Sequence, residues 1–345
     1  MRKYQIRRTL SETVILILLA LLYLPNPVLA DQSTQVLTVD SVGMTVSDMD
    51  KALDFYTNVL SFKKVSDVEL LGSEYEEFEG VFGLRIRVVQ LQLGDENIVL
   101  TDYLTPEGKE FPQDTRSNDR WFQHIAIVVS DMDKAFEYLK SHKVRYASTA
   151  PQTLPDWNKN AAGIKAFYFR DPDGHFLEII WFPPGKGNTK WQNTKDKLFL
   201  GIDHTAIVVG STDESLKYYR DTLGMNIAGE SNNYGTEQEH LNNVFGANLR
   251  ITGMKSESGP GIEFLEYLSP GDGRAIPLDM KSNDIMQWQT TLTVNNANEA
   301  SVALRKLGYK VISAIPVDFP DDELGFEKGF LAKDPDGHVM RIIEK

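Results

Sequence analysis

Short stretches of alternating hydrophobic and polar residues recur along this chain, and each is followed by a stretch with helical spacing. Residues 41–46 alternate as a half-buried strand does, and hydrophobic residues then recur at helical spacing from Asp48 to Leu60. Asp48 is a suitable N-cap for that helix. Residues 84–93 and 98–103 alternate again. The pattern predicts a strand, a helix and then further strands.

The same order returns three more times. The later first strands are predicted at 124–129, 204–209 and 289–294, the helices at 131–141, 215–223 and 299–307, and the closing strands at 166–169, 176–182, 249–251, 262–268, 329–331 and 338–343. We therefore predict an α+β protein of four βαβββ modules, at residues 36–106, 121–183, 198–270 and 286–345.

The four modules fall into two duplicated halves. Asp-Pro-Asp-Gly-His at 171–175 returns at 334–338, and Asp-Gly within it suits a type I′ hairpin turn. We predict one domain at 36–183 and a second at 198–345. Residues 184–197, rich in Gly, Pro, Lys and Asn, are predicted to link them.

The N-terminal thirty residues resemble a secretory signal peptide. Arg2, Lys3, Arg7 and Arg8 precede a short apolar run at 14–24, and small residues stand before a cleavage point after Ala30. An uncleaved anchor is the alternative. We expect cleavage and export to the periplasm or the exterior, with no remaining membrane attachment.

Composition narrows the classes of partner. The chain has a net charge of −13, and removal of a segment with net charge +3 gives −13 − 3 = −16. This acidity disfavours nucleic acids and anionic membranes as partners. The chain contains no cysteine, so a thiolate can be neither metal ligand nor nucleophile.

Four βαβββ modules in two fused pairs resemble the vicinal oxygen chelate superfamily, which includes glyoxalase I, bleomycin-resistance proteins and extradiol dioxygenases. The residues that carry the resemblance are the two Asp-Pro-Asp-Gly-His segments, Gln123 to Val129, and Gly201 to Val209. The resemblance implies cupped mixed sheets, in which each module offers two metal-ligand positions, one on its first strand and one on its last.

Carried onto this sequence, those positions are unequally filled. They are Ser41 and Val99, His124 and Glu178, His204 and Glu263, and Gln289 and Arg341. If the modules pair in a nested order, the second with the third, the resemblance implies one metal site of His124, Glu178, His204 and Glu263. If neighbours pair instead, neither half has a complete site. Singly, each histidine could be structural, but a carboxylate in an apolar strand is costly unless paired or metal-bound.

The resemblance implies a glyoxalase-like lyase or isomerase that acts on a small α-oxygenated substrate through a metal-stabilised ene-diolate. One divalent ion (Ni, Co, Mn, Fe or Zn) is expected, with Glu178 or Glu263 moving the proton. A non-catalytic binding protein of the bleomycin-resistance type is the alternative. An extradiol dioxygenase is disfavoured, because its ligand positions would be His204, Gln289 and Arg341. We expect a small-molecule partner and a monomer or homodimer.

Overall fold

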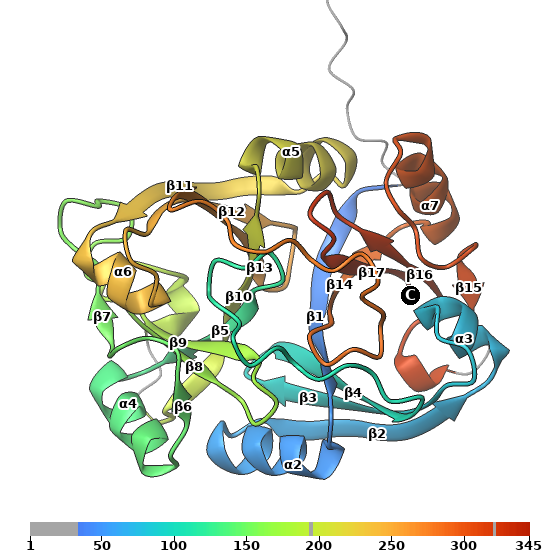
Figure 1. Ribbon diagram of the computed structural model, residues 1–345, viewed down its shortest axis with the longest axis horizontal. Helices are drawn as coiled ribbons and strands as arrows, with labels where there is room; N and C mark the ends of the chain where they lie inside the picture. Colours follow the sequence, from blue (N-terminus) through green and yellow to red (C-terminus); the bar gives the residue numbers. More distant parts are fainter. Residues whose placement is uncertain (1–33, 193–195, 320–321) are drawn as a thin grey trace, which may run out of the picture. The chain divides into compact units, whose positions relative to one another are not determined.

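The computed structural model describes residues 34–192, 196–319 and 322–345, and the predicted signal peptide lies outside these ranges. The strands form two sheets (Figure 1). The first sheet has the order β15-β16-β17-β14-β1-β4-β3-β2. Its strands are β1 (Val36–Val46), β2 (Lys63–Leu71), β3 (Arg85–Leu93), β4 (Glu96–Thr105), β14 (Trp288–Val294), β15 (Val317–Asp318), β16 (Lys328–Lys333) and β17 (Val339–Glu344). We call it the outer sheet, because it joins the first and last modules.

The second sheet joins the second and third modules, and we call it the inner sheet. Its order is β11-β12-β13-β10-β5-β9-β8-β6, with β7 paired to β8. The strands are β5 (Gln123–Val129), β6 (Arg145–Tyr146), β7 (Gln152–Thr153), β8 (Lys165–Arg170), β9 (Phe176–Trp181), β10 (Phe199–Val209), β11 (Asn226–Tyr234), β12 (Asn248–Lys255) and β13 (Gly261–Ser269).

The two sheets settle how the modules pair. In each sheet the first strands of two modules lie side by side and antiparallel, β1 with β14 and β5 with β10. Each first strand also runs parallel to the last strand of its own module, as β5 does with β9. The modules are therefore nested, which is the order that unites the four His and Glu positions.

A helical segment follows the first strand of every module, as the hydrophobic spacing predicts. These segments are α2 (Met49–Leu53) continued by the π-helix η2 (Asp54–Val59), α4 (Met132–Ser141), α5 (Thr212–Leu216) continued by η4 (Lys217–Thr222), and α7 (Ala297–Lys306). Asp48 caps α2 by accepting a hydrogen bond from the backbone N–H of Lys51, as predicted. Short 3-10 helices lie at Thr189–Trp191, in the predicted linker, and at Asp322–Leu324.

Two further helices were not predicted. They are α3 (Ser73–Glu79) and α6 (Thr236–Asn242), which precede β3 and β12. Both are polar and short, so neither has the hydrophobic repeat on which the sequence reading depends. Each helix supplies a buried polar side chain near the ligand positions of one sheet, α3 in the outer sheet and α6 in the inner sheet.

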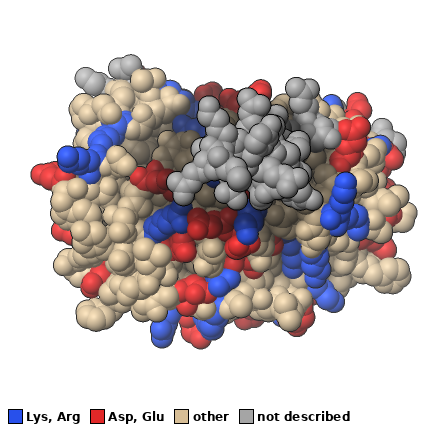
Figure 2. Space-filling view, turned by 90° about the horizontal axis from the view of Figure 1, so that it is seen from above, with Lys and Arg blue, Asp and Glu red and all other residues tan. Residues whose placement is uncertain are grey.

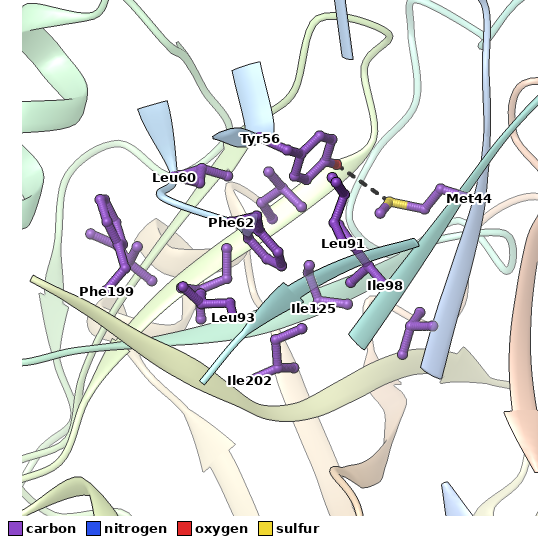
Figure 3. Close-up of a cluster of buried hydrophobic side chains, with 14 of the residues drawn as sticks. Met44, Tyr56, Leu60, Phe62, Leu91, Leu93, Ile98, Ile125, Phe199 and Ile202 are labelled. Carbon is purple, nitrogen blue, oxygen red and sulfur yellow. Dashed lines mark hydrogen bonds between the residues drawn. The ribbon is translucent and has the colours of Figure 1, made fainter. Parts of the chain in front are cut away.

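The sheets share hydrophobic cores. One core combines α2 and α4 with strands of both sheets; Figure 3 shows part of it, with Tyr56, Phe62 and Leu91 close to Ile125 and Ile202. A second core similarly combines α5 and α7 with both sheets. Complete burial of a large apolar side chain stabilises the fold by about 1.5–3 kcal/mol. The shared cores therefore make the inner and outer sheets parts of one folded unit.

The repeated Asp-Pro-Asp-Gly-His turns also connect the sheets, and the type I′ prediction for them was wrong. Gly174 has φ 108°, but Asp173 does not have a positive φ. The carboxylate of Asp171 instead accepts hydrogen bonds from the backbone N–H groups of Asp173, Gly174 and His175. The hydroxyl of Tyr56, from the first module, donates to Asp171 at 3.1 Å.

The turn histidines are buried, although hairpin turns usually place their residues at the surface. His175 and His338 have exposed fractions of 0% and 4%. Nε2 of His175 donates to the carbonyl of Ile285, and Nε2 of His338 donates to the carbonyl of Val208, which lies in the other sheet. Each of these histidines therefore links two modules through a hydrogen bond.

Figure 2 shows the charged side chains on one face of the molecule. On the part of the face in Figure 2 that is not grey, acidic and basic residues alternate without forming a single large patch. Among the described residues, no helix is long and apolar enough to cross a membrane.

Candidate metal centre

Neighbouring strands of the inner sheet place the four predicted ligands in two adjacent rows. In one row Glu263 and His124 flank Ala206, and in the other His204 and Glu178 flank Ala126. Paired residues on neighbouring strands point to the same face, so all four side chains share one face of the sheet. The central residue of each row is an alanine, which leaves room above the sheet.

The four side chains converge. Oε2 of Glu178 lies 3.0 Å from Nε2 of His124 and 3.6 Å from Nε2 of His204, and Oε2 of Glu263 lies 3.6 Å from the same His204 nitrogen. Ligand atoms of His124, Glu178 and His204 all lie within 4.8 Å of one another. His124, Glu178 and His204 therefore surround one point, and Glu263 approaches it beside His204.

This donor set fits a divalent metal ion. Nδ1 and Nε2 of His124 and Nε2 of His204 are buried and have no hydrogen-bond partner among the described residues. Nε2 of His124 is close to Glu178 but is not aligned for a hydrogen bond. Buried polar atoms are normally satisfied. Imidazole and carboxylate ligands suit Zn, Fe, Ni, Co and Mn, so a cation would satisfy these atoms.

The pKa values of the two histidines are shifted in opposite directions. Burial lowers the pKa of His124 and favours its neutral form, which is the form that binds metals. Burial also lowers the pKa of His204, but Glu263, Asp203 and Glu178 outweigh that effect and raise it to about 10. Burial raises the pKa of Glu263, against the attraction of His204. The carboxylates of Glu178, Asp203 and Glu263 thus give the site an excess of negative groups, which favours a bound cation.

Asp203 was not predicted to take part. A β-bulge lies between Ile202 and His204, and Oδ2 of Asp203 is 3.1 Å from Nδ1 of His204. Nε1 of Trp191, in the predicted linker, donates to Oδ1 of Asp203 at 2.9 Å. A carboxylate on the second ring nitrogen fixes the orientation of a ligating histidine. The sequence offers a partial signal, because Asp203 directly precedes His204.

Aromatic side chains line one side of the centre. The rings of Phe122 and Tyr168 lie 5.5 and 4.8 Å from that of His124. Tyr267 is also buried on this side, where it accepts a hydrogen bond from Nδ2 of Asn242 on α6 and donates to the carbonyl of Ser117. Phe264, the neighbour of Glu263 on β13, packs against Tyr219 in the helix-covered core.

The equivalent region of the outer sheet is occupied by a polar network. Arg341 donates to Oε1 of Gln289 at 3.0 Å through Nε, and its Nη2 lies 3.3 Å from Oε1 of Glu79. Nε2 of Gln289 and the hydroxyl of Tyr103 both donate to Oε2 of Glu79. Glu79 comes from α3 and was missed, since an acidic residue on a polar helix reads as exposed. Ser41 and Val99 add no ligand there.

A second group of possible ligands, Asp171, Asp173 and His175, has partners already. Asp171 accepts three backbone hydrogen bonds and binds His175, and Asp173 accepts from the backbone and hydroxyl of Ser47. This group holds the turn and needs no ion.

Comparisons with known proteins agree with this geometry. Residues 38–179 and 201–342 match the family model of the Glyoxalase/Bleomycin resistance protein/Dioxygenase superfamily. A 2-epi-5-epi-valiolone epimerase of Actinomyces sp is 31% identical over 157 residues, covering 43% of this chain and 80% of that protein. A lactoylglutathione lyase of Schizosaccharomyces pombe is 25% identical over 189 residues, covering 53% of this chain and 57% of that protein.

Solved structures share the fold. Glyoxalase I from Zea mays superposes with a TM-score of 0.56 at 18% identity, covering 90% of this chain and 92% of that one. A putative dioxygenase from Bacillus subtilis gives 0.55 at 13% identity, covering 90% and 86%. Both family-model matches together span most of the sequence, one in each duplicated half. The chain therefore belongs to the Glyoxalase/Bleomycin resistance protein/Dioxygenase superfamily.

Proposed function

We propose that this protein is a divalent-metal-dependent lyase or isomerase that acts on a small α-oxygenated substrate. The observation that carries the proposal is the convergence of His124, Glu178, His204 and Glu263 on one face of the inner sheet. The relatives named above as an epimerase and a lactoylglutathione lyase support this class of reaction.

The four residues would hold one cation, which would polarise a substrate carbonyl and ease loss of a proton from the neighbouring carbon. A carboxylate then has to accept that proton. The side chain of Glu263 is 28% exposed and that of Glu178 only 5%. Glu263 is therefore the carboxylate that contacts the substrate, and the more buried Glu178 lies against both histidines. Burial raises the pKa of Glu263, which makes it a better proton acceptor.

The other two readings of the sequence have less support. The dioxygenase ligand positions His204, Gln289 and Arg341 are divided between the sheets, and Arg341 is committed to Glu79 and Gln289. A binding protein without a metal would leave three buried imidazole nitrogens without a partner in the part of the chain that the structure describes. Export of the protein after cleavage at Ala30 remains part of the proposal and is tested by N-terminal sequencing of protein from a cell envelope fraction.

Two measurements test the proposed function. Elemental analysis of protein purified without added metal should find about one transition-metal ion per chain. The loaded protein should then catalyse exchange of the α-proton of small α-hydroxyketones with deuterated water, followed by NMR. The double variant Glu178→Gln/Glu263→Gln should lose at least about a hundredfold of this exchange, within the range that general base catalysis contributes.

A matched control is available in the outer sheet. Val99 holds the position there that Glu263 holds in the inner sheet. Val99→Gln should leave metal content and exchange rate unchanged. Exchange that persists in the double glutamine variant would refute the proposed base, and a metal-free protein that still binds ligands would favour the binding module.

A further inference from the structure

Two glycines extend the row of Glu263, Ala206 and His124 past Glu263, toward the edge of the inner sheet. Gly253 on β12 pairs with Glu263, and Gly229 on β11 pairs with Gly253. Paired residues share a face, so both glycines lie on the face that holds the metal ligands. Strands are about 4.8 Å apart, so this strip without side chains, which we call the floor, extends about 10 Å beyond the strand of Glu263.

A register shift lies between Ile227 and Gly229, but neither the φ angle nor the space around a Cβ requires glycine at either position. Neither Gly229 nor Gly253 has a positive φ. A Cβ on Gly229 would meet no atom within 4 Å, and one on Gly253 would meet only the carbonyl oxygen of Gly229, at 3.8 Å. Glycine in a strand interior weakens the strand and often marks a close approach by a ligand.

Gly261 shows what a structural glycine looks like in the same sheet. It pairs with His204, and a Cβ there would lie 3.3 Å from the carbonyl oxygen of Met254 and 3.4 Å from Cβ of His204. Packing accounts for Gly261. The outer sheet lacks the floor altogether, because Gln90 and Ser66 stand where the inner sheet has Gly253 and Gly229.

The far end of the floor is bounded by a segment of the second module, residues 157–160. Nδ2 of Asn160 donates to the carbonyl of Glu230 at 2.7 Å, and Nδ2 of Asn158 donates to Oδ1 of Asn233 at 2.6 Å. The ring of Trp157 stacks on that of Tyr234 with centroids 4.2 Å apart. The floor is thus a limited space between the metal centre and this segment.

A positive charge lies beside the floor. Lys255 follows Gly253 by two residues on β12, so it points to the same face, and it is exposed. Among the described residues Lys255 forms no ion pair. A lone cation at the edge of a pocket in an acidic protein selects anionic ligands.

The geometry points to Gly253 and Gly229 as the subsite for the body of the substrate, with Lys255, beside this floor, binding an anionic group of the substrate. This inference rests on the proposed function, because the metal must hold the substrate's two adjacent oxygens. It names the substrate class: an α-oxygenated compound whose carbon skeleton continues past the chelating oxygens and ends in a carboxylate or phosphate.

Binding of three hydroxamates to the cobalt-loaded protein tests the inference, with the visible spectrum of the cobalt as readout. Acetohydroxamate supplies the chelating group alone, hexanohydroxamate adds a neutral arm, and the monohydroxamate of adipic acid adds an arm with a carboxylate. The wild type should bind the adipic compound at least about tenfold more tightly than acetohydroxamate, with hexanohydroxamate between them.

Two variants separate the contribution of the floor to affinity from that of the Lys255 charge. Gly253→Val should remove most of the advantage of both arms, and Lys255→Gln only that of the carboxylate, while both keep the affinity for acetohydroxamate within about twofold. Valine suits a strand, and Gln90→Val at the matching outer position is the control for folding. Equal affinities in the wild type, or arms unaffected by Gly253→Val, would overturn the subsite. Failure of the proposed function would look different, because the protein would retain no cobalt and bind none of the three.

Discussion

Glu178 and Arg341 hold the same position in the two sheets. Each lies on the last strand of its module, paired with the first strand at the matching register, Ala126 for Glu178 and Thr291 for Arg341. Glu178 faces two histidines, and Arg341 faces Glu79 and Gln289. One scaffold thus carries a candidate metal centre in one copy and a buried ion pair in the other.

We expect the Arg341–Glu79 pair to be a structural element. Removing one partner of a buried ion pair leaves an uncompensated charge and costs about 3–5 kcal/mol. Arg341→Met should therefore lower the free energy of unfolding by about 3 kcal/mol in urea denaturation. The double variant Arg341→Met/Glu79→Gln should recover much of that loss, and metal content should stay unchanged in both. A loss of metal in Arg341→Met would contradict the separation of the two sites.

Asp203 should act on metal affinity through His204. Asp203→Asn keeps the size of the side chain but removes the charge that orients the imidazole, and changes of this kind weaken metal binding by about 10–100-fold. Competition with a coloured chelator measures the effect. Asp40, which precedes Ser41 in the first module and pairs with Lys345, provides the matched control. Asp40→Asn should leave the affinity unaltered; an equal loss in both variants would indicate a general effect on the fold.

Metal removal should reduce stability in a way that depends on the two histidines. A ligand present at about a hundred times its dissociation constant stabilises the folded state by about 2.7 kcal/mol. Chelation should accordingly lower the melting temperature of the wild type, and His204→Ala should melt at one temperature with or without chelator. His142, at the exposed end of α4, serves as the control. His142→Ala should respond to chelator as the wild type does.

The buried His175–Asp171 pair should make stability depend on pH at the alkaline end. Both ring nitrogens of His175 face acceptors, Asp171 and the carbonyl of Ile285, so the ring is doubly protonated. Burial lowers the pKa of His175, but Asp171 outweighs it and raises it from 6.5 to about 9. The folded state therefore holds this proton more tightly than the unfolded state does.

The contribution of His175 is complete below pH 6.5 and is lost as the pH rises through about 9. Its size is on the order of 3 kcal/mol. The pKa of Asp171 is lowered by His175 and backbone N–H groups against the effect of burial, so its contribution disappears only as the solution becomes strongly acidic. Urea denaturation across this range should show the alkaline decline in the wild type. His175→Gln should flatten it; an unchanged slope would assign the decline to other groups.

Much of the fold could be read from local patterns. The alternation of hydrophobic residues predicted the first and last strands of every module, and the position of Asp48 predicted the start of α2. Helices α3 and α6 could not be predicted from the sequence, because they are short and have no continuous apolar stripe. Only a few of their residues pack against the rest of the fold. The turn at Asp171 was predicted with the wrong geometry, since side-chain hydrogen bonds to the backbone replace the type I′ conformation.

The sequence by itself determined which modules keep a His and a Glu at the matched positions, because the repeat aligns each residue with its counterpart in another copy. Only the tertiary structure decided that His124 and His204 face one another, with ring centroids 5.7 Å apart. The pairing of β5 with β10 depends on contacts between residues about 80 positions apart in the chain, such as Ala206 with His124. Glu79, Asp203 and the bare floor at Gly253 likewise depend on the neighbours that folding supplies, and no local pattern encodes those.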